Sequence, residues 1–280
     1  MRGVRKGFAL ALGGGGARGL AHVGVLKTFE RENVPIACIA GTSMGGLIGA
    51  AWASGYSAPE IEAEALRLGQ WDQIFRLADF GISKKGVMSG RRLRRYLNDK
   101  LGENLTFDEL VLPLALVAVD ITTGREVVLT EGSVLDAMRA TMSIPGLFAP
   151  MEMKGMKLVD GGLLINVPAA EARALVNGPV IAVDVMPDFS GNEPGQPPIV
   201  KPWDVKRVPG VVADLIRAEN IMMSAITRVN LEKTKPEVLI RPDIPSDLSA
   251  MAGFHRAEEC IRAGEVAAEA SMDRIRELAG

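Results

Sequence analysis

The chain has 280 residues, of which 48% are hydrophobic and 24% are charged, and its formal net charge at pH 7 is −2. This composition excludes a disordered chain. The slight acidic excess argues against general nucleic-acid binding, which requires a clear surplus of Lys and Arg, and aromatic residues at 5% leave few surfaces for base stacking.

The N-terminus and the cysteines favour a cytoplasmic protein without a bound metal or cofactor. A basic start is followed by the apolar stretch 8–12, which is too short for a signal peptide and continues into four glycines. Cys38 and Cys260 lack the spacing of a metal site or a disulfide framework. The long apolar run 34–53 contains a proline and several glycines, so it favours a strand, turn and helix over a membrane span.

The first half of the chain alternates strand and helix patterns. Residues 7–12 and 36–40 read as strands, 17–31 as the helix between them, and a helix of small residues follows residue 43. This alternation favours parallel strands joined by crossover helices, and so a three-layer α/β/α sandwich with a mostly parallel central sheet.

The second half continues this pattern without a clear domain boundary. Residues 188–210, rich in proline and glycine, are predicted to form a long loop. We expect a single catalytic domain over 1–280, with a core at about 8–185 and a C-terminal loop and helices at about 186–280. Further strands are predicted at 113–119, 127–129, 157–159, 179–185 and 237–240, and helices at 133–142, 168–176, 211–233 and 250–278, the last as one helix or a broken pair.

Ser43 stands in a G-x-S-x-G motif, Gly41-Thr42-Ser43-Met44-Gly45, directly after the second predicted strand. A strand that turns sharply into a helix needs small residues on both sides of the turn, which exposes the serine hydroxyl beyond the sheet edge. The pattern therefore predicts a nucleophile elbow. The alternative is a buried serine that caps the following helix.

The glycines at 13–16 lie between the first strand and the first helix, where backbone N–H groups can bind an anion. Gly14 to Gly19 also satisfies the G-x-G-x-x-G pattern of dinucleotide-binding proteins, but those proteins place an acidic residue at the end of the second strand. Here that strand ends at Ser43, and no Lys-Ser or Lys-Thr follows the glycines. An oxyanion hole facing the serine is the favoured interpretation.

A serine needs a base to become a nucleophile, and the chain has only two histidines. His22 precedes the serine, whereas an α/β-hydrolase has its histidine after both serine and acid, and His255 lies among residues typical of a solvated helix face. Asp160 is a better candidate, because it follows a short apolar strand and precedes Gly161 and Gly162. An aspartate that only hydrogen-bonds its own turn is the alternative.

Taken in order, the G-G-G-G-A-R-G, G-T-S-M-G and D-G-G motifs resemble the patatin-like phospholipase family, in particular its bacterial branch, related to the esterase domain of neuropathy target esterase. Residues 139–150 and Asn166-Val167-Pro168 are similar to the segments that flank the acid in this family, so the resemblance spans about 8–185. It implies a Ser43 nucleophile, an Asp160 base, and an oxyanion hole from the amides around Gly14, Gly15 and Gly16. The supporting positions are Arg18, Gly41, Gly45, Gly161 and Gly162.

The resemblance implies a hydrolase of lipid esters, through an acyl-enzyme and without a cofactor. The apolar lining of its site could come from Ile144, Leu147, Phe148, Met222 and Met223, although methionines on a helix are also common core residues. A catalytically idle adaptor on the same fold is the alternative function.

The segment 84–95 carries six basic residues and no acid. It predicts either peripheral contact with an anionic membrane or an ordinary solvated helix face.

Overall fold

The computed structural model describes residues 6–69, 80–83, 86–187, 210–245, 247–248 and 253–280. Its centre is an eight-stranded sheet in the order β10-β9-β1-β2-β5-β8-β7, with β6 also paired to β5. The strands are β1 (Phe8–Leu12), β2 (Ile36–Thr42), β5 (Leu114–Asp120), β6 (Arg125–Leu129), β7 (Met151–Met153), β8 (Met156–Asp160), β9 (Val180–Val183) and β10 (Val238–Ile240); β3 (Phe80–Ser83) and β4 (Gly86–Met88) form a separate antiparallel hairpin.

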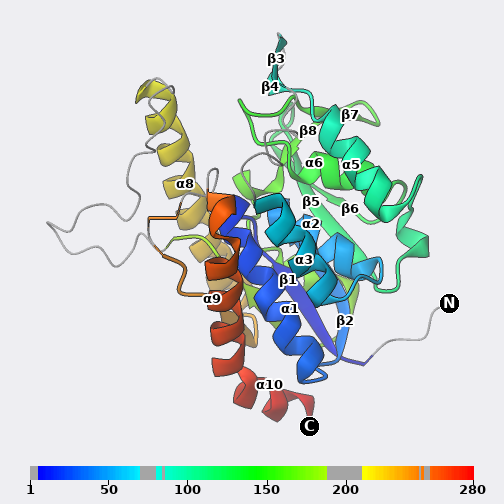
Figure 1. The fold of residues 1–280 in the computed structure, drawn as a ribbon, viewed down its shortest axis with the longest axis vertical. Helices are drawn as coiled ribbons and strands as arrows, with labels where there is room; N and C mark the ends of the chain where they lie inside the picture. Colours follow the sequence, from blue (N-terminus) through cyan, green and yellow to red (C-terminus); the bar gives the residue numbers. More distant parts are fainter. Residues whose placement is uncertain (1–5, 70–79, 84–85, 188–209, 246, 249–252) are drawn as a thin grey trace, which may run out of the picture.

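Helices cover both faces of the sheet, so the structure confirms the predicted three-layer sandwich with a mostly parallel centre (Figure 1). The α-helices are α1 (Ala21–Arg31), α2 (Ser43–Ala53), α3 (Ala58–Gly69), α5 (Arg91–Leu101), α6 (Val134–Thr141), α7 (Ala169–Leu175), α8 (Gly210–Thr234), α9 (Ala257–Ala270) and α10 (Met272–Ala279). Short 3-10 helices are η1 (Gly16–Leu20), η2 (Phe107–Glu109), η3 (Gly161–Leu163) and η4 (Gly253–Arg256).

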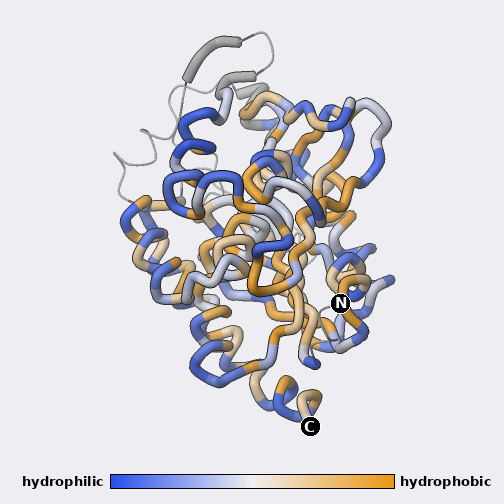
Figure 2. Tube along the Cα trace, turned by 90° about the vertical axis from the view of Figure 1, so that its right-hand side faces the viewer, coloured by the Kyte–Doolittle hydropathy of each residue, from blue (hydrophilic) through white to orange (hydrophobic). Residues whose placement is uncertain are grey.

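The two faces of the sheet differ in side-chain size. Along β1, Phe8, Leu10 and Leu12 point to one face and pack with α1, α2 and α9, because successive side chains of a strand alternate between faces. Ala9 and Ala11 point to the other face and pack with α7 and α8. The small residues let those two helices lie close to the sheet. Figure 2 shows hydrophobic segments through the centre of the molecule and hydrophilic ones at its periphery.

β2 and β8 meet end to end along one edge of β5. β2 pairs in parallel with residues 114–117 of β5, and β8 pairs antiparallel with residues 118–120. β6 pairs with residues 116–120 and so occupies the opposite edge along both stretches. The last residue of β2, Thr42, therefore pairs with Val117, and the last residue of β8, Asp160, pairs with the next residue, Ala118. This register brings together two chain segments more than a hundred residues apart.

The predicted helix at 17–31 differs from the structure at its start. The chain forms the 3-10 helix η1 before α1, and η1 begins at Gly16 with a φ of +55°, a conformation suited to glycine. Among its described residues, the predicted region 250–278 forms η4 and then a broken pair of helices, since α9 ends before Ser271 and α10 follows it. The predicted loop at 188–210 lies outside the described residues, apart from Gly210, which begins α8.

Helix α3 is an element that the sequence analysis missed. Its start carries a recognisable signal, because Ser57 and Glu60 have the spacing of a capping box. The Glu60 carboxylate accepts hydrogen bonds from the Ser57 backbone N–H at 2.8 Å and from the Ser57 hydroxyl at 2.7 Å.

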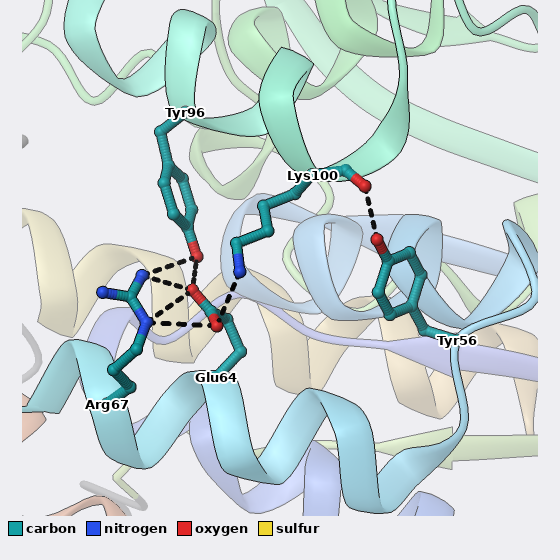
Figure 3. A network of polar contacts seen from close by, with 5 residues as sticks. All are labelled: Tyr56, Glu64, Arg67, Tyr96 and Lys100. Atoms are coloured by element: carbon teal, nitrogen blue, oxygen red, sulfur yellow. Dashed lines mark hydrogen bonds and ion pairs between the residues drawn. The ribbon is translucent and has the colours of Figure 1, made fainter.

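A polar network joins α3 to α5 (Figure 3). The carboxylate of Glu64 accepts hydrogen bonds from Arg67 and Tyr96, and from Lys100 Nζ at 3.0 Å. The Arg67 guanidinium is the main cause of a Glu64 pKa of about 2. Tyr56 adds a hydrogen bond to the Lys100 carbonyl. The network fixes the orientation of α5, although such partly exposed ion pairs contribute little stability.

No helix among the described residues is long and apolar enough to cross a membrane.

Candidate active site

Ser43 lies at a sharp turn between β2 and α2, as the elbow motif predicts. Its φ of +52° is left-handed, which non-glycine residues rarely adopt. A Cβ at Gly45 would collide with the Leu12 carbonyl, so the turn needs glycine there. Thr42, rather than Ser43, occupies the N-cap of α2, and it makes no side-chain cap. The capping alternative is therefore wrong.

Thr141 of α6 hydrogen-bonds to the turn that carries Ser43. Its Oγ1 accepts the Ser43 backbone N–H at 2.9 Å and donates to the Val117 carbonyl of β5 at 2.5 Å. One hydroxyl thus ties the nucleophile turn to the strand against which Asp160 pairs.

Asp160 is buried at the end of β8 and lines the same pocket as Ser43. Its backbone N–H donates to the Ser143 carbonyl at 3.0 Å, and its Oδ1 accepts the Gly162 N–H at 2.8 Å. Burial raises the pKa of Asp160 to about 7, against the lowering effect of Ser43 and of the Gly162 hydrogen bond, and Glu219 adds a smaller upward shift. Asp160 therefore makes a hydrogen bond within its own turn and also borders the pocket of Ser43, and its role as a base stays a prediction.

The glycine loop lies beside Ser43, and Gly14, Gly15 and Gly16 line the same pocket. The structure corrects one detail, because the Gly14 N–H already donates to the Asn166 carbonyl at 3.1 Å. Among the residues that the structure describes, the N–H groups of Gly15 and Gly16 have no such backbone acceptor. These two amides are the available donors, and the oxyanion hole itself stays a prediction.

Arg18 connects the glycine loop to two distant segments of the chain through hydrogen bonds. Its buried guanidinium donates from Nε to the Val185 carbonyl at 2.9 Å and from Nη1 to the Pro245 carbonyl at 3.2 Å. The predicted supporting role of Arg18 is therefore a link between η1 and two distant segments of the chain.

Close backbone packing explains the supporting glycines at the other two turns. A Cβ at Gly41 would stand 2.6 Å from the Gly46 Cα, and one at Gly161 would collide with the Val117 carbonyl. Gly162 supplies the N–H that binds Asp160.

The pocket at Ser43 has a volume of about 70 Å³. Besides apolar residues and Asp160, its lining contains the side-chain amides of Asn166 and Asn220 and the carboxyl of Glu219. Ile144 and Met223 line it as expected, whereas Met222 is 63% exposed on the outer side of α8. Phe148 instead packs against the Arg139 guanidinium, 5.0 Å from its ring centre. Lining residues that sequence analysis did not assign to the site are Leu163, Asn166, Met186, Glu219 and Asn220.

Neither histidine lines the described part of this pocket. His22 is fully buried in α1, with Nε2 2.7 Å from the Gly13 carbonyl, and burial lowers its pKa to about 4. It is therefore neutral and supports the glycine loop. His255 is exposed in η4.

A larger cavity, of about 390 Å³, opens at the other end of the sheet, where β5 begins. Its described lining contains one carboxylate and one hydroxyl but no histidine or lysine, and consists of Phe107, Asp108, Pro113, Leu114, Thr130 and Leu175. The chemistry thus gathers in the smaller pocket. No group of three His, Cys, Asp or Glu side chains within the described ranges is placed to hold a metal ion.

Known proteins are similar to this chain in sequence and in fold. A family model described as patatin-like phospholipase matches residues 10–173. An uncharacterized NTE family protein of Mycobacterium tuberculosis is 32% identical over 279 residues, covering 95% of this chain and 46% of that protein. This chain thus spans about half the length of such mycobacterial relatives.

Two eukaryotic proteins match a shorter stretch. Neuropathy target esterase sws of Drosophila melanogaster and lysophospholipase NTE1 of Yarrowia lipolytica are each 32% identical over 64% of this chain and 13% of their own length. The crystal structure of VipD from Legionella pneumophila has a similar fold, with a TM-score of 0.55 at 14% identity over 98% of this chain and 67% of VipD.

Proposed function

Because the chain belongs to the patatin-like phospholipase family, we propose that it is a serine hydrolase that cleaves carboxylic esters of lipids, with residues 1–280 acting as a single catalytic domain. The observation that carries this proposal is that Ser43, the buried Asp160 and the glycine loop line one pocket. The relatives named as an esterase and a lysophospholipase support a lipid ester as substrate, in line with the apolar residues of the pocket.

In the proposed cycle, Ser43 Oγ attacks the ester carbonyl carbon while its proton passes to Asp160. The N–H groups of Gly15 and Gly16 stabilise the negative charge on the carbonyl oxygen. When the tetrahedral intermediate collapses, the bond to the alcohol oxygen breaks and Asp160 gives the proton to that oxygen. Water then hydrolyses the acyl-enzyme by the same steps, which restores Ser43.

A raised pKa suits Asp160 to this work. An ordinary aspartate, with a pKa near 3.9, is a weak base at neutral pH, whereas a base with a pKa near the working pH transfers protons in both directions more efficiently. Burial raises the pKa of Asp160 to about 7.

Ser43→Ala and Asp160→Asn should each lower ester hydrolysis by about three orders of magnitude or more, because each removes one half of the dyad. Hydrolysis of a panel of lipid and short-chain esters measures this effect, with circular dichroism to confirm folding. Ser54→Ala is the matched control, since Ser54 only hydrogen-bonds the Ala50 carbonyl of its own helix.

Covalent labelling with a fluorophosphonate separates the hydrolase from an idle adaptor. The native chain and Ser54→Ala should be labelled, and Ser43→Ala should not. A folded native chain that takes up no label and hydrolyses no ester would favour the adaptor.

We further propose peripheral contact with anionic lipid through α5. Arg91, Arg92, Arg94 and Arg95 are exposed on this helix, and Arg94 pairs with Asp136 at 2.8 Å. Lys84 and Lys85, which belong to the same basic segment, lie outside the described residues. A row of cations next to an anionic surface contributes about 1 kcal/mol per residue.

Reversal of Arg91, Arg92 and Arg95 to Glu should reduce co-sedimentation with vesicles containing phosphatidylserine at least about tenfold. Binding to neutral phosphatidylcholine vesicles should stay low in all variants. Arg274→Glu on α10 is the matched surface control, and equal binding of all variants to anionic vesicles would remove the membrane proposal.

A further inference from the structure

Asn166 joins the glycine loop to the turn that follows Asp160. Its side chain is 1% exposed. Its backbone carbonyl accepts the Gly14 N–H at 3.1 Å, and its Nδ2 donates to the Gly14 carbonyl at 3.3 Å. The second bond identifies the two ends of the amide, because the reverse orientation would place two carbonyl oxygens against each other.

The other end of this amide, Oδ1, is a buried acceptor in the catalytic pocket. It receives no hydrogen bond from any residue that the structure describes. A buried acceptor left without a donor costs roughly 1–3 kcal/mol, so such groups are rare and call for an explanation.

Oδ1 of Asn166 borders the same space as both members of the dyad. A Cβ at Gly162 would stand 3.1 Å from Asn166 Oδ1 and 3.1 Å from Asp160 Oδ1. A Cβ at Gly14 would stand 2.7 Å from Asn166 Oδ1 and 3.1 Å from Ser43 Cβ. The position next to Gly162, which the flexible end of Met223 also approaches, therefore faces two acceptor oxygens, and one of them, Asn166 Oδ1, also borders Gly14 beside Ser43.

The number of O–H donors distinguishes the two kinds of molecule that can remove an acyl group from Ser43. Water has two O–H groups, so it can donate to Asp160 and to a second acceptor at once. An alcohol has one O–H group, which the base requires. A second acceptor near Asp160 thus orients water, but it receives no hydrogen bond from an alcohol whose single O–H group is bound to Asp160.

We propose that Asn166 Oδ1 is this second acceptor and directs the acyl group to water rather than to an alcohol. This inference rests on the proposed function. The water oxygen bonds to the acyl carbonyl carbon, one proton passes to Asp160, and the other O–H stays hydrogen-bonded to Asn166. The bond between the acyl carbon and Ser43 Oγ then breaks, and Asp160 returns its proton to that oxygen.

Asn166→Leu removes the acceptor and keeps a side chain of similar size. Asn230→Leu is the matched control, because Asn230 of α8 also ties a loop through its Nδ2, which donates to the Leu164 carbonyl at 2.9 Å, but it does not line the pocket. The comparison separates the loss of an acceptor from the loss of a tether.

Gly162→Ala tests the same space and leaves Asn166 intact. Its methyl group would occupy the position between the two acceptor oxygens, and the nearest other atom is the flexible end of Met223, 2.6 Å away. The Gly162 N–H that binds Asp160 is kept.

The experiment follows a short-chain p-nitrophenyl ester in stopped flow, with methanol as the competing acceptor. In Asn166→Leu, the ratio of methyl ester to free acid should rise about fivefold to tenfold, the value of one hydrogen bond. In Gly162→Ala, turnover after the burst should fall about tenfold relative to the burst rate. Asn230→Leu should keep the native ratio.

An unchanged ratio in folded Asn166→Leu would overturn the inference, because a tether to Gly14 alone affects both acceptors equally. If Asn166→Leu does not fold, an unchanged turnover relative to burst in Gly162→Ala overturns it instead. A native chain that forms no acyl-enzyme would overturn the proposed function as well, whereas an acyl-enzyme with unchanged partition overturns this inference alone.

Discussion

The two residues of the proposed dyad reach the pocket in different ways. The nucleophile arm, which we define as residues 8–53, is continuous in sequence and places Ser43 by local means, through a parallel strand, a glycine-flanked turn and a helix. The acid arm, residues 114–163, places Asp160 by an antiparallel strand that continues the line of β2 along β5. Local turn chemistry thus fixes one half of the site, and the register of distant strands fixes the other.

Burial acts on a titratable group in each arm with opposite sign. In the nucleophile arm, burial lowers the pKa of His22 to about 4, and in the acid arm it raises the pKa of Asp160 to about 7. Both shifts have the same cause, since a low-dielectric interior favours the neutral form of a base and of an acid alike. The contrast leads to predictions that separate the arms.

The largest expected effect is on stability as a function of pH. His22 has a lower pKa in the folded chain than in the unfolded chain. As pH falls from 6.5 to 4, the native protein should therefore lose about 3 kcal/mol of stability relative to His22→Gln. Asp160 has a higher pKa in the folded chain, so relative to Asp160→Asn the native protein loses a similar amount as pH rises from 3.8 to 7.

Urea unfolding of the three proteins between pH 4 and 7.5 measures these differences. Two difference curves with the same slope, or with none, would contradict the opposite effects of burial in the two arms.

Activity should depend on pH through the acid arm alone. In the proposed mechanism Asp160 acts as a base and must be ionised, so kcat/KM should fall about tenfold per unit below pH 7, to about one hundredth at pH 5. Glu219 of α8 also faces this site, its own pKa is raised by burial, and its charge raises the pKa of Asp160. Glu219→Gln should therefore move the midpoint of the profile to lower pH.

The pH profile of kcat/KM for a neutral ester checks this expectation in the native protein and in Glu219→Gln. His22→Gln should keep the native midpoint. A midpoint near pH 4 in the native protein would show that the pKa of Asp160 is not raised.

A smaller effect is expected where the arms are joined. Thr141→Val leaves the Ser43 N–H and the Val117 carbonyl without their partner, so it should lower the free energy of unfolding by about 2 kcal/mol and reduce kcat less than Ser43→Ala. Thr28→Val is the matched control, since Thr28 is equally buried and its Oγ1 has no partner among the described residues.

Thermal and urea unfolding of both valine variants measure how much the Thr141 hydrogen bonds contribute to the free energy of unfolding. Thr28→Val should be neutral or slightly stabilising, because it replaces an unpaired hydroxyl with a methyl group. Equal effects in the two variants would show that the Thr141 bridge contributes nothing specific.

Sequence patterns predicted the elements with a strong period and the site motifs that depend on turn chemistry. The strand before Ser43, the elbow and the glycine loop follow from small residues at fixed spacing. The pattern was weaker for α3, although Ser57 and Glu60 carried its capping signal. β7 has only three residues, Met-Glu-Met, which is too short for their alternation to indicate a strand.

The sequence by itself determined which residues can do chemistry, because a serine between glycines and an aspartate before glycines are properties of short segments. Only the tertiary structure decided which of them meet. The end-to-end placement of β2 and β8 along β5 brings Asp160 to Ser43, and the Asn166 carbonyl takes the Gly14 amide away from the predicted oxyanion hole. Such contacts depend on strand register and backbone direction between distant segments, which no local pattern of residues records.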